Sequence, residues 1–369
     1  MNMALIALPC HGQPVRPPLT LAYVATLLEQ RRHIVRIYDL GLEPELNLGA
    51  ALQPLRSFRP QVVVVSGDRP EIFAPAVAAL HEDKYGQVLP VPMSRSGLDA
   101  SPVCSEVLQW LDRQNGLATA GAPPLDLDAL PLPARHLLPL ESYNLRAAGG
   151  ELQTTLLVGA LEADGRFALR SPTRIVAELR SVSAEFGLRH YLIADVPVTL
   201  DRAWLVELLT RLCDANLGIG WEASADPEQL DADLVAHMAR AGCEGLFFQL
   251  DAASLFESTA AREALRRAVT NARQHDIFLR ANLKLEPPYE SIPQLVDVAA
   301  TFGLDDVHFD VARAEAASVG ADETQLREMA RQIYDQGRDR QRLINRFGAA
   351  LGSLIWRLRG PRPVGPDEE

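Results

Sequence analysis

Short apolar segments alternate with amphipathic helical patterns along most of this chain, and this alternation constrains the fold more than any other feature. Over the first 115 residues it predicts strands at 3–9, 34–40, 61–66 and, interrupted by two prolines, 88–93, and helices at 19–31, 46–58, 70–85 and 102–114. The third strand contains four consecutive valines, which is typical of a parallel sheet covered on both faces. We therefore predict a doubly wound, Rossmann-like α/β domain of reduced size over residues 1–115.

The same alternation resumes after residue 151. It predicts strands at 152–161, 190–194, 218–222, 245–250, 277–283 and 306–309, and helices at 172–186, 201–215, 231–241, 260–274 and 292–302. Six strand units are too few for the eight-unit TIM barrel. We therefore predict a partial (β/α)6 barrel over residues 151–315.

Two further segments flank the predicted barrel. Residues 116–150 form a Pro-rich linker without a clear hydrophobic period, which we expect to run along the surface of both domains. Residues 316–369 form a helical tail whose part at 342–359 is basic and apolar. The favoured interpretation is a helix that packs its apolar face on the barrel. The alternative is a helix that makes a peripheral membrane contact or docks on a partner protein.

Charge and cysteine content narrow the class of protein. The formal net charge is −12, from 36 basic and 48 acidic residues, which argues against a nucleic-acid binder. No apolar run is long enough to span a membrane, and the N-terminus does not resemble a signal peptide. The four cysteines, Cys10, Cys104, Cys213 and Cys243, are too scattered for a disulfide framework or a zinc ribbon. We expect a cytoplasmic protein with reduced thiols.

Several segments carry a more specific resemblance. Residues 17–28 read PPLTLAYVATLL, residues 125–139 read LDLDALPLPARHLLP, residues 171–179 read SPTRIVAEL, and residues 238–243 read MARAGC. Similar segments occur in this order in the cobalamin (B12)-binding-domain radical-SAM family, whose linker signature is D-x-L-P-x-P-A-R. The chain resembles that family from about residue 3 to about residue 310.

The resemblance implies a cobalamin-binding domain followed by a barrel that binds S-adenosylmethionine (SAM) and a [4Fe–4S] cluster. It places Pro18, Tyr23, Ser66, Gly67 and Asp68 in a vestigial cobalamin crevice, and Asp195 and Asp251 in a vestigial SAM region. Acidic side chains at strand ends are suited to hold a ribose hydroxyl. Retention of cobalamin stays open at this point.

One sequence difference from the family matters more for the expected function than these similarities do. A radical-SAM enzyme holds its cluster by three thiolates in a C-x3-C-x2-C loop after the first barrel strand. Here residues 154–165 read TTLLVGALEADG and contain no cysteine. The glycines of the family's SAM-binding strand end are also replaced, by FQLDAA at 248–253. We therefore expect no [4Fe–4S] cluster, no protein metal ligands and no catalytic residues of the radical type.

Other reactive side chains have ordinary alternatives. Cys10 and His11 are adjacent, and adjacent side chains point apart in extended backbone, so a nucleophile–base pair is disfavoured. Lys284 suits a Schiff base or, more simply, an ion pair with Glu222 or Asp251. His308 and Asp310 share one face of a strand and would bind a metal only together with Glu222.

Two functions remain. The first is a catalytically degenerate, non-catalytic partner, scaffold or regulatory subunit of a related radical-SAM enzyme, or a homo-oligomer. The second is a cluster-free ligand-binding protein or enzyme that retains cobalamin or a SAM-like ligand at the domain interface. No nucleic-acid partner is expected in either case.

Overall fold

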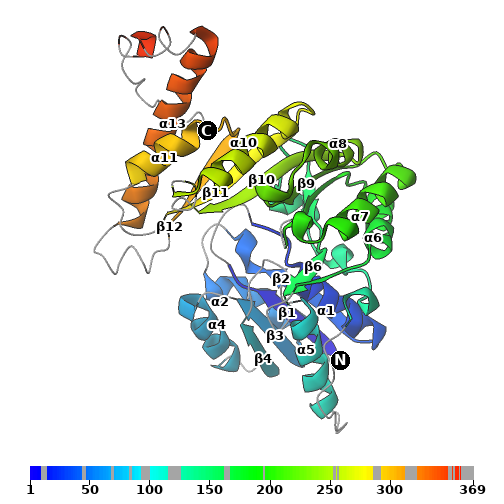
Figure 1. The fold of residues 1–369 in the computed structure, drawn as a ribbon. Helices are drawn as coiled ribbons and strands as arrows, with labels where there is room; N and C mark the ends of the chain where they lie inside the picture. Colours follow the sequence, from blue (N-terminus) through cyan, green and yellow to red (C-terminus); the bar gives the residue numbers. More distant parts are fainter. Residues whose placement is uncertain are drawn as a thin grey trace. The chain divides into compact units, whose positions relative to one another are not determined.

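The computed structural model describes residues 1–9, 15–43, 47–67, 70–82, 85–92, 100–114, 126–161, 167–193, 196–251, 255, 257–285, 292–311, 322–347, 351, 354–356 and 358 (Figure 1). The chain divides into two compact units. One comprises residues 1–196 and 203–221, and the other comprises residues 197–202 and 222–369.

The N-terminal sheet is fully parallel, as predicted. Its strands are β1 (Asn2–Ala7), β2 (Ile34–Asp39), β3 (Val62–Gly67) and β4 (Gln87–Pro92), in the order β2-β1-β3-β4. Strand β4 tolerates Pro90 and Pro92 because it lies at the edge of the sheet, where a proline removes no hydrogen bond from a further strand.

Both faces of this sheet are buried, which explains the apolar strands. Met3, Leu5, Val62 and Val64 belong to one core cluster, together with residues of helices α1 and α5, and the intervening residues belong to a second cluster with α3 and α4. The helices are α1 (Leu19–Gln30), α2 (Leu48–Ala51), α3 (Gln53–Phe58), α4 (Pro70–Glu82) and α5 (Ala100–Gln114).

The single helix predicted at 46–58 is wrong in one respect. The structure has two short helices, α2 and α3, joined at Leu52. Pro54 lies in the first turn of α3 and has no backbone N–H to continue the hydrogen bonds of α2.

The linker contributes to the core, which corrects the expectation that it runs along the surface. Leu127, Leu130 and Ala134 join the core cluster beside α1, and Thr26 Oγ1 donates a hydrogen bond of 2.8 Å to the Leu132 carbonyl. The linker also contains the 3-10 turns η2 (Leu127–Ala129), η3 (Arg135–Leu137) and η4 (Leu140–Tyr143).

The second sheet has six strands, which confirms the predicted partial barrel. They are β5 (Gln153–Thr155), β8 (His190–Ile193), β9 (Gly220–Ser224), β10 (Cys243–Asp251), β11 (Phe278–Leu285) and β12 (Asp306–Val311), in the order β12-β11-β10-β9-β8-β5. Within this sheet each strand neighbours the one that follows it in chain order, with at least one helix between them, so the sheet forms a half-barrel.

The strand predicted at 152–161 divides after Thr155. Its second part, β6 (Gly159–Leu161), pairs antiparallel with β7 (Phe167–Leu169) in a separate hairpin. Gly159 permits this pairing because a Cβ atom at that position would lie 2.8 Å from the Ala168 carbonyl oxygen.

The helices of the half-barrel follow the predicted periodicity closely. They are α6 (Pro172–Phe186), α7 (Arg202–Ala215), α8 (Ala232–Arg240), α10 (Thr259–Arg273), α11 (Ile292–Ala300) and α13 (Glu323–Phe347). Side-chain caps define several starts: Ser171, Asp231 and Ser258 each accept a hydrogen bond from a first-turn N–H. None of the helices in the described ranges combines the length and apolarity that a membrane crossing requires.

Candidate functional site

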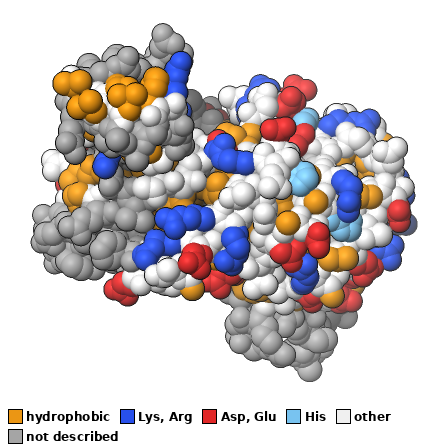
Figure 2. Space-filling model, turned by 45° about the horizontal axis from the view of Figure 1, so that its top comes forward, with side chains coloured by type: hydrophobic (Ala, Val, Ile, Leu, Met, Phe, Trp, Pro, Cys, Tyr) orange, Lys and Arg blue, Asp and Glu red, His pale blue; other side chains and the backbone are white. Residues whose placement is uncertain are grey.

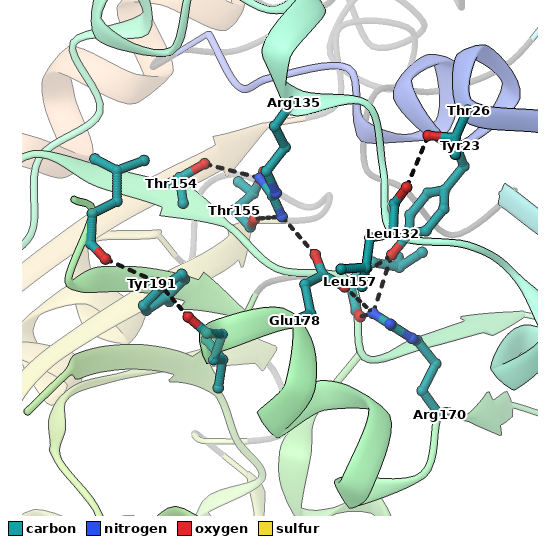
Figure 3. Close-up of polar contacts among 12 residues, drawn as sticks. Tyr23, Thr26, Leu132, Arg135, Thr154, Thr155, Leu157, Arg170, Glu178 and Tyr191 are labelled. Carbon is teal, nitrogen blue, oxygen red and sulfur yellow. Dashed lines mark hydrogen bonds and ion pairs between the residues drawn. The ribbon is translucent and has the colours of Figure 1, made fainter. Parts of the chain in front are cut away.

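A buried ionic network lies at the centre of the first unit (Figure 3). The Glu178 carboxylate accepts hydrogen bonds from Arg135 Nη2 at 2.8 Å and from Arg170 Nη1 at 2.7 Å. All three side chains are at most 1 % exposed. The Tyr23 hydroxyl completes the group, 3.3 Å from the same carboxylate and 3.1 Å from Arg170 Nη1.

The network joins segments that are distant in sequence. Tyr23 belongs to α1, Arg135 to the linker, and Glu178 to α6, while Arg170 directly precedes the Ser171 cap of α6. Two cations and one anion leave an excess positive charge, which two backbone carbonyls offset. Arg135 donates to the Thr155 carbonyl at 2.8 Å and Arg170 to the Leu157 carbonyl at 2.7 Å.

The protonation states of these side chains indicate a structural role for the network. Burial by itself would raise the pKa of the Glu178 carboxyl, but the Arg170 and Arg135 guanidiniums outweigh it and hold that pKa below its usual range. Burial, followed by the charge of Glu178, raises the pKa of Tyr23, so its hydroxyl stays protonated and donates. An ionised Glu178 and a protonated Tyr23 fit an ion-pair network that joins these elements.

The ionic residues Arg135, Arg170 and Glu178 were not predicted as a group, although the sequence carries a signal for them. Arg135 ends the linker motif and Glu178 lies in the SPTRIVAEL segment. On α6, Glu178 is next to Leu179 and three residues from Ile175, both buried. A charged residue at such a position requires a buried partner of opposite charge.

The segment that follows β5 is apolar and buried. Leu156, Leu157 and Val158 are fully or almost fully inaccessible, and Leu157 belongs to the core cluster that includes α1 and β1. Arg170 holds the backbone of this segment, because its N–H donates to the Val158 carbonyl at 2.8 Å as its guanidinium donates to Leu157. This is the position at which the resembled family carries its cluster loop.

The three cysteines that the structure describes do not fit a [4Fe–4S] cluster. A cluster of the radical-SAM type needs three thiolates on one short loop. Cys104 lies in α5, Cys213 in α7 and Cys243 in β10, while Cys10 is outside the described residues. Burial raises the pKa of the Cys104 thiol to about 12 and also raises the pKa of Cys243, which disfavours their thiolates. Among the described residues no three His, Cys, Asp or Glu side chains are arranged for a metal ion.

The predicted cobalamin residues occupy different environments. Tyr23 is part of the ionic network, and Pro18 is buried at the start of α1. Ser66 is buried, and its carbonyl accepts a hydrogen bond from Leu8 N–H at 2.8 Å. Gly67 is closely packed, because a Cβ there would lie 3.1 Å from the Leu8 side chain. Asp68 lies outside the described residues, so cobalamin binding stays a prediction.

The predicted barrel residues come together on one face of the second sheet. Strand register aligns Asp251 with Lys284 and Lys284 with Asp310, and in the preceding row it aligns Gln249 with Asn282 and Asn282 with His308. Because side chains two residues apart share a face, these two rows form one surface. Lys284, His308 and Asp310 are exposed and Asp251 is half-buried. Asp195 is outside the described residues.

The opposite face of these strands is apolar. Leu250, Leu283 and Phe309 alternate with the polar residues and are buried. Parallel sheets are ordinarily covered and apolar on both faces. A polar row of acid, lysine and acid across β10, β11 and β12 is therefore a surface suited to a polar ligand or a charged partner. Glu222 is buried on β9 beside Gly245, where an added Cβ would lie 2.9 Å from Glu222 Cγ.

The first unit also contains a cavity of about 690 Å³. Its lining comes from residues 135, 136 and 138–142 of the linker, from Glu151 and Leu152, and from residues 186–190. Leu152 and His190 mark the amino ends of β5 and β8, whereas barrel enzymes place their chemistry at the carboxyl ends of the strands. The cavity is thus distinct in position from a standard barrel active site.

Comparison with known proteins supports the resemblance in fold. No family model matches the sequence. An uncharacterised methyltransferase of Pyrococcus horikoshii is 21 % identical over 283 residues, which cover 64 % of this chain and 61 % of that protein. The chain thus spans less than two thirds of this relative.

Solved structures give a longer match. TsrM from Kitasatospora setae, a radical S-adenosylmethionine methyltransferase with cobalamin and a [4Fe–4S] cluster bound, aligns with a TM-score of 0.60 and 15 % identity, over 84 % of this chain and 74 % of TsrM. TsrM with tryptophan and a SAM analogue bound aligns with a TM-score of 0.61 and 17 % identity, over 84 % and 72 % of the two chains. This chain therefore has a mixed α/β fold with a parallel half-barrel, similar to that of a cobalamin-binding radical SAM methyltransferase.

Proposed function

We propose that this chain is a cluster-free, non-catalytic relative of the radical SAM methyltransferases that acts as a partner or regulatory subunit of a related enzyme. The observation that carries the proposal is the segment Leu156, Leu157 and Val158, which is buried where a cluster loop would follow β5. Leucine and valine have no donor atom for iron.

The surroundings of this segment support the absence of a cluster loop. The Leu157 side chain packs in the core, and its carbonyl is held by the buried Arg170. A loop that enclosed a cluster here would have to leave this core and release that hydrogen bond. The packing thus supports a role other than radical chemistry.

The polar face of β10–β12 is the surface that we assign to the partner. Lys284 lies between Asp251 and Asp310 in the strand register, and the row continues the polar residues Gln249, Asn282 and His308. These side chains extend across three strands and several are exposed, which suits a protein surface with its own pattern of charges.

Anaerobic iron–sulfur reconstitution tests the absence of a cluster. We expect no stoichiometric absorbance at about 400 nm after gel filtration, whereas a cluster-bearing relative treated in parallel acquires it. A variant with all four cysteines replaced by alanine is the control, because adventitious iron on surface thiols would disappear in it. A stoichiometric cluster that survives gel filtration in the unmodified chain would contradict the proposal.

The partner role is tested with a cluster-bearing relative from the same genome. We expect the two proteins to co-purify and the relative's turnover to change when this chain is added. Lys284→Glu reverses the charge at the centre of the polar row and should weaken the complex, whereas Arg262→Glu on α10 is a matched charge reversal away from that row. If wild type and Lys284→Glu form the complex equally well, the polar row is not part of the interface.

A second candidate function is ligand binding without a cluster. It is favoured by the half-buried Asp251 at the end of β10, which is suited to accept a hydrogen bond from a ribose hydroxyl. Equilibrium dialysis with SAM and with cobalamin tests it. Binding of SAM that is lost in Asp251→Asn would support this function. If the protein binds neither SAM nor cobalamin, only the partner role is left.

A further inference from the structure

The C-terminal segment 340–359 differs in charge from the rest of the chain. It contains five arginines and no aspartate or glutamate, within a protein whose formal net charge is −12. Five of its large apolar residues, Leu343, Phe347, Leu351, Leu354 and Leu358, follow one another at intervals of three or four, and Ile344, Ile355 and Trp356 lie beside them in the sequence. On a helix this spacing places the five apolar residues on one face, with Arg342 and Arg346 outside that face and Arg340 within it.

The first part of α13 is firmly attached to the edge of the half-barrel. Arg331 Nη1 donates to the Val307 carbonyl at 3.1 Å, and Arg338 Nη1 donates to the Asp305 carbonyl at 2.8 Å. Tyr334 is fully buried, with its ring 5.9 Å from that of Phe309. The helix therefore covers the open edge of β12, a frequent means of protecting an edge strand.

The apolar residues beyond Arg338 have a different environment. Phe347, Leu351, Leu354 and Leu358 are 42 %, 51 %, 50 % and 79 % exposed. Hydrophobic side chains gather at the upper left of Figure 2, where the C-terminal segment lies. The end of α13 extends beyond the sheet in Figure 1. The favoured expectation that the whole tail packs its apolar face on the barrel is thus met by the first part of α13 and not by these residues.

We propose that residues 340–359 bind an anionic lipid surface as an interfacial helix. Such helices combine an apolar face with an arginine- or lysine-rich polar face, and anionic headgroups attract the latter. Charge complementarity favours lipid over a second copy of this acidic chain, because five arginines without an acid match a uniformly negative surface. Because the rest of the protein is negatively charged, an anionic bilayer would repel it, and it would face away from the lipid.

Vesicle co-sedimentation of the full-length protein tests the proposal. We expect binding to phosphatidylcholine vesicles that contain phosphatidylglycerol, much weaker binding to pure phosphatidylcholine, and release by high salt. Each arginine near the surface contributes about fivefold to binding, so Arg342→Gln with Arg346→Gln should weaken it about 25-fold. The matched control is Arg202→Gln with Arg211→Gln, two exposed arginines outside the segment.

The apolar face is tested separately. Leu351→Glu with Leu354→Glu should abolish binding, whereas Leu200→Glu with Val206→Glu adds the same charge at exposed apolar positions elsewhere and serves as the control. Sedimentation velocity without lipid accompanies both pairs. The proposal would be overturned by no binding to anionic vesicles, or by binding that does not depend on lipid charge and salt. It would also be overturned if the protein did not bind lipid and formed a dimer that only the variants within residues 340–359 disrupt.

Discussion

Replacing Glu178 by glutamine should cost more stability than any other single polar substitution in the first unit. The change removes the only acidic partner of Arg135 and Arg170 in the network and leaves two guanidiniums in a site where both are at most 1 % exposed. Breaking one buried ion pair costs about 3–5 kcal/mol. Because a glutamine oxygen still accepts one hydrogen bond, we expect a loss of about 4 kcal/mol for Glu178→Gln.

Urea unfolding followed by circular dichroism measures this loss. With a slope of about 2 kcal/mol per M, the unfolding midpoint of the first unit should fall by about 2 M. The control is Glu185→Gln, an exposed residue on the same helix, which should change stability by at most about 0.5 kcal/mol. Equal midpoints for Glu178→Gln and Glu185→Gln would show that the network does not support the fold as argued.

Three further predictions follow from the same region and from the cysteines. The pKa of Glu178 is lowered on folding, so its contribution to the free energy of unfolding is complete above the unfolded value of 4.5 and is lost as pH falls through the folded pKa. In urea titrations at acid pH, wild type should therefore lose more stability than Glu178→Gln does. Leu157→Ala should cost about 2–5 kcal/mol in urea unfolding, and near-zero cost would contradict the packing of the segment after β5. A thiol reagent should modify exposed Cys213 before buried Cys104, as mass spectrometry of partially labelled protein will show; the reverse order would contradict the assigned burial.

The order of strands and helices was predictable because periodicity is a local property. The valine-rich strand β3 and the starts of α6 and α10 follow from apolar runs and from capping serines. The predicted boundaries were wrong where the local sequence pattern is compatible with two different structures. Residues 156–161 continue the predicted strand with an apolar run, and only the pairing of β6 with β7 shows that the strand ends at Thr155. The break at Leu52 depends on Pro54, whose effect on the helix was visible in the sequence.

The sequence by itself determined the alternation of strands and helices, the parallel sheets and the lack of thiolates after the first barrel strand. Only the tertiary structure decided how the segment after that strand packs and which charges meet. Tyr23 and Glu178 are 155 residues apart in the chain, yet they share one buried network. Periodicity reports which face of an element is buried, whereas the pairing of buried charges depends on how distant elements pack against one another.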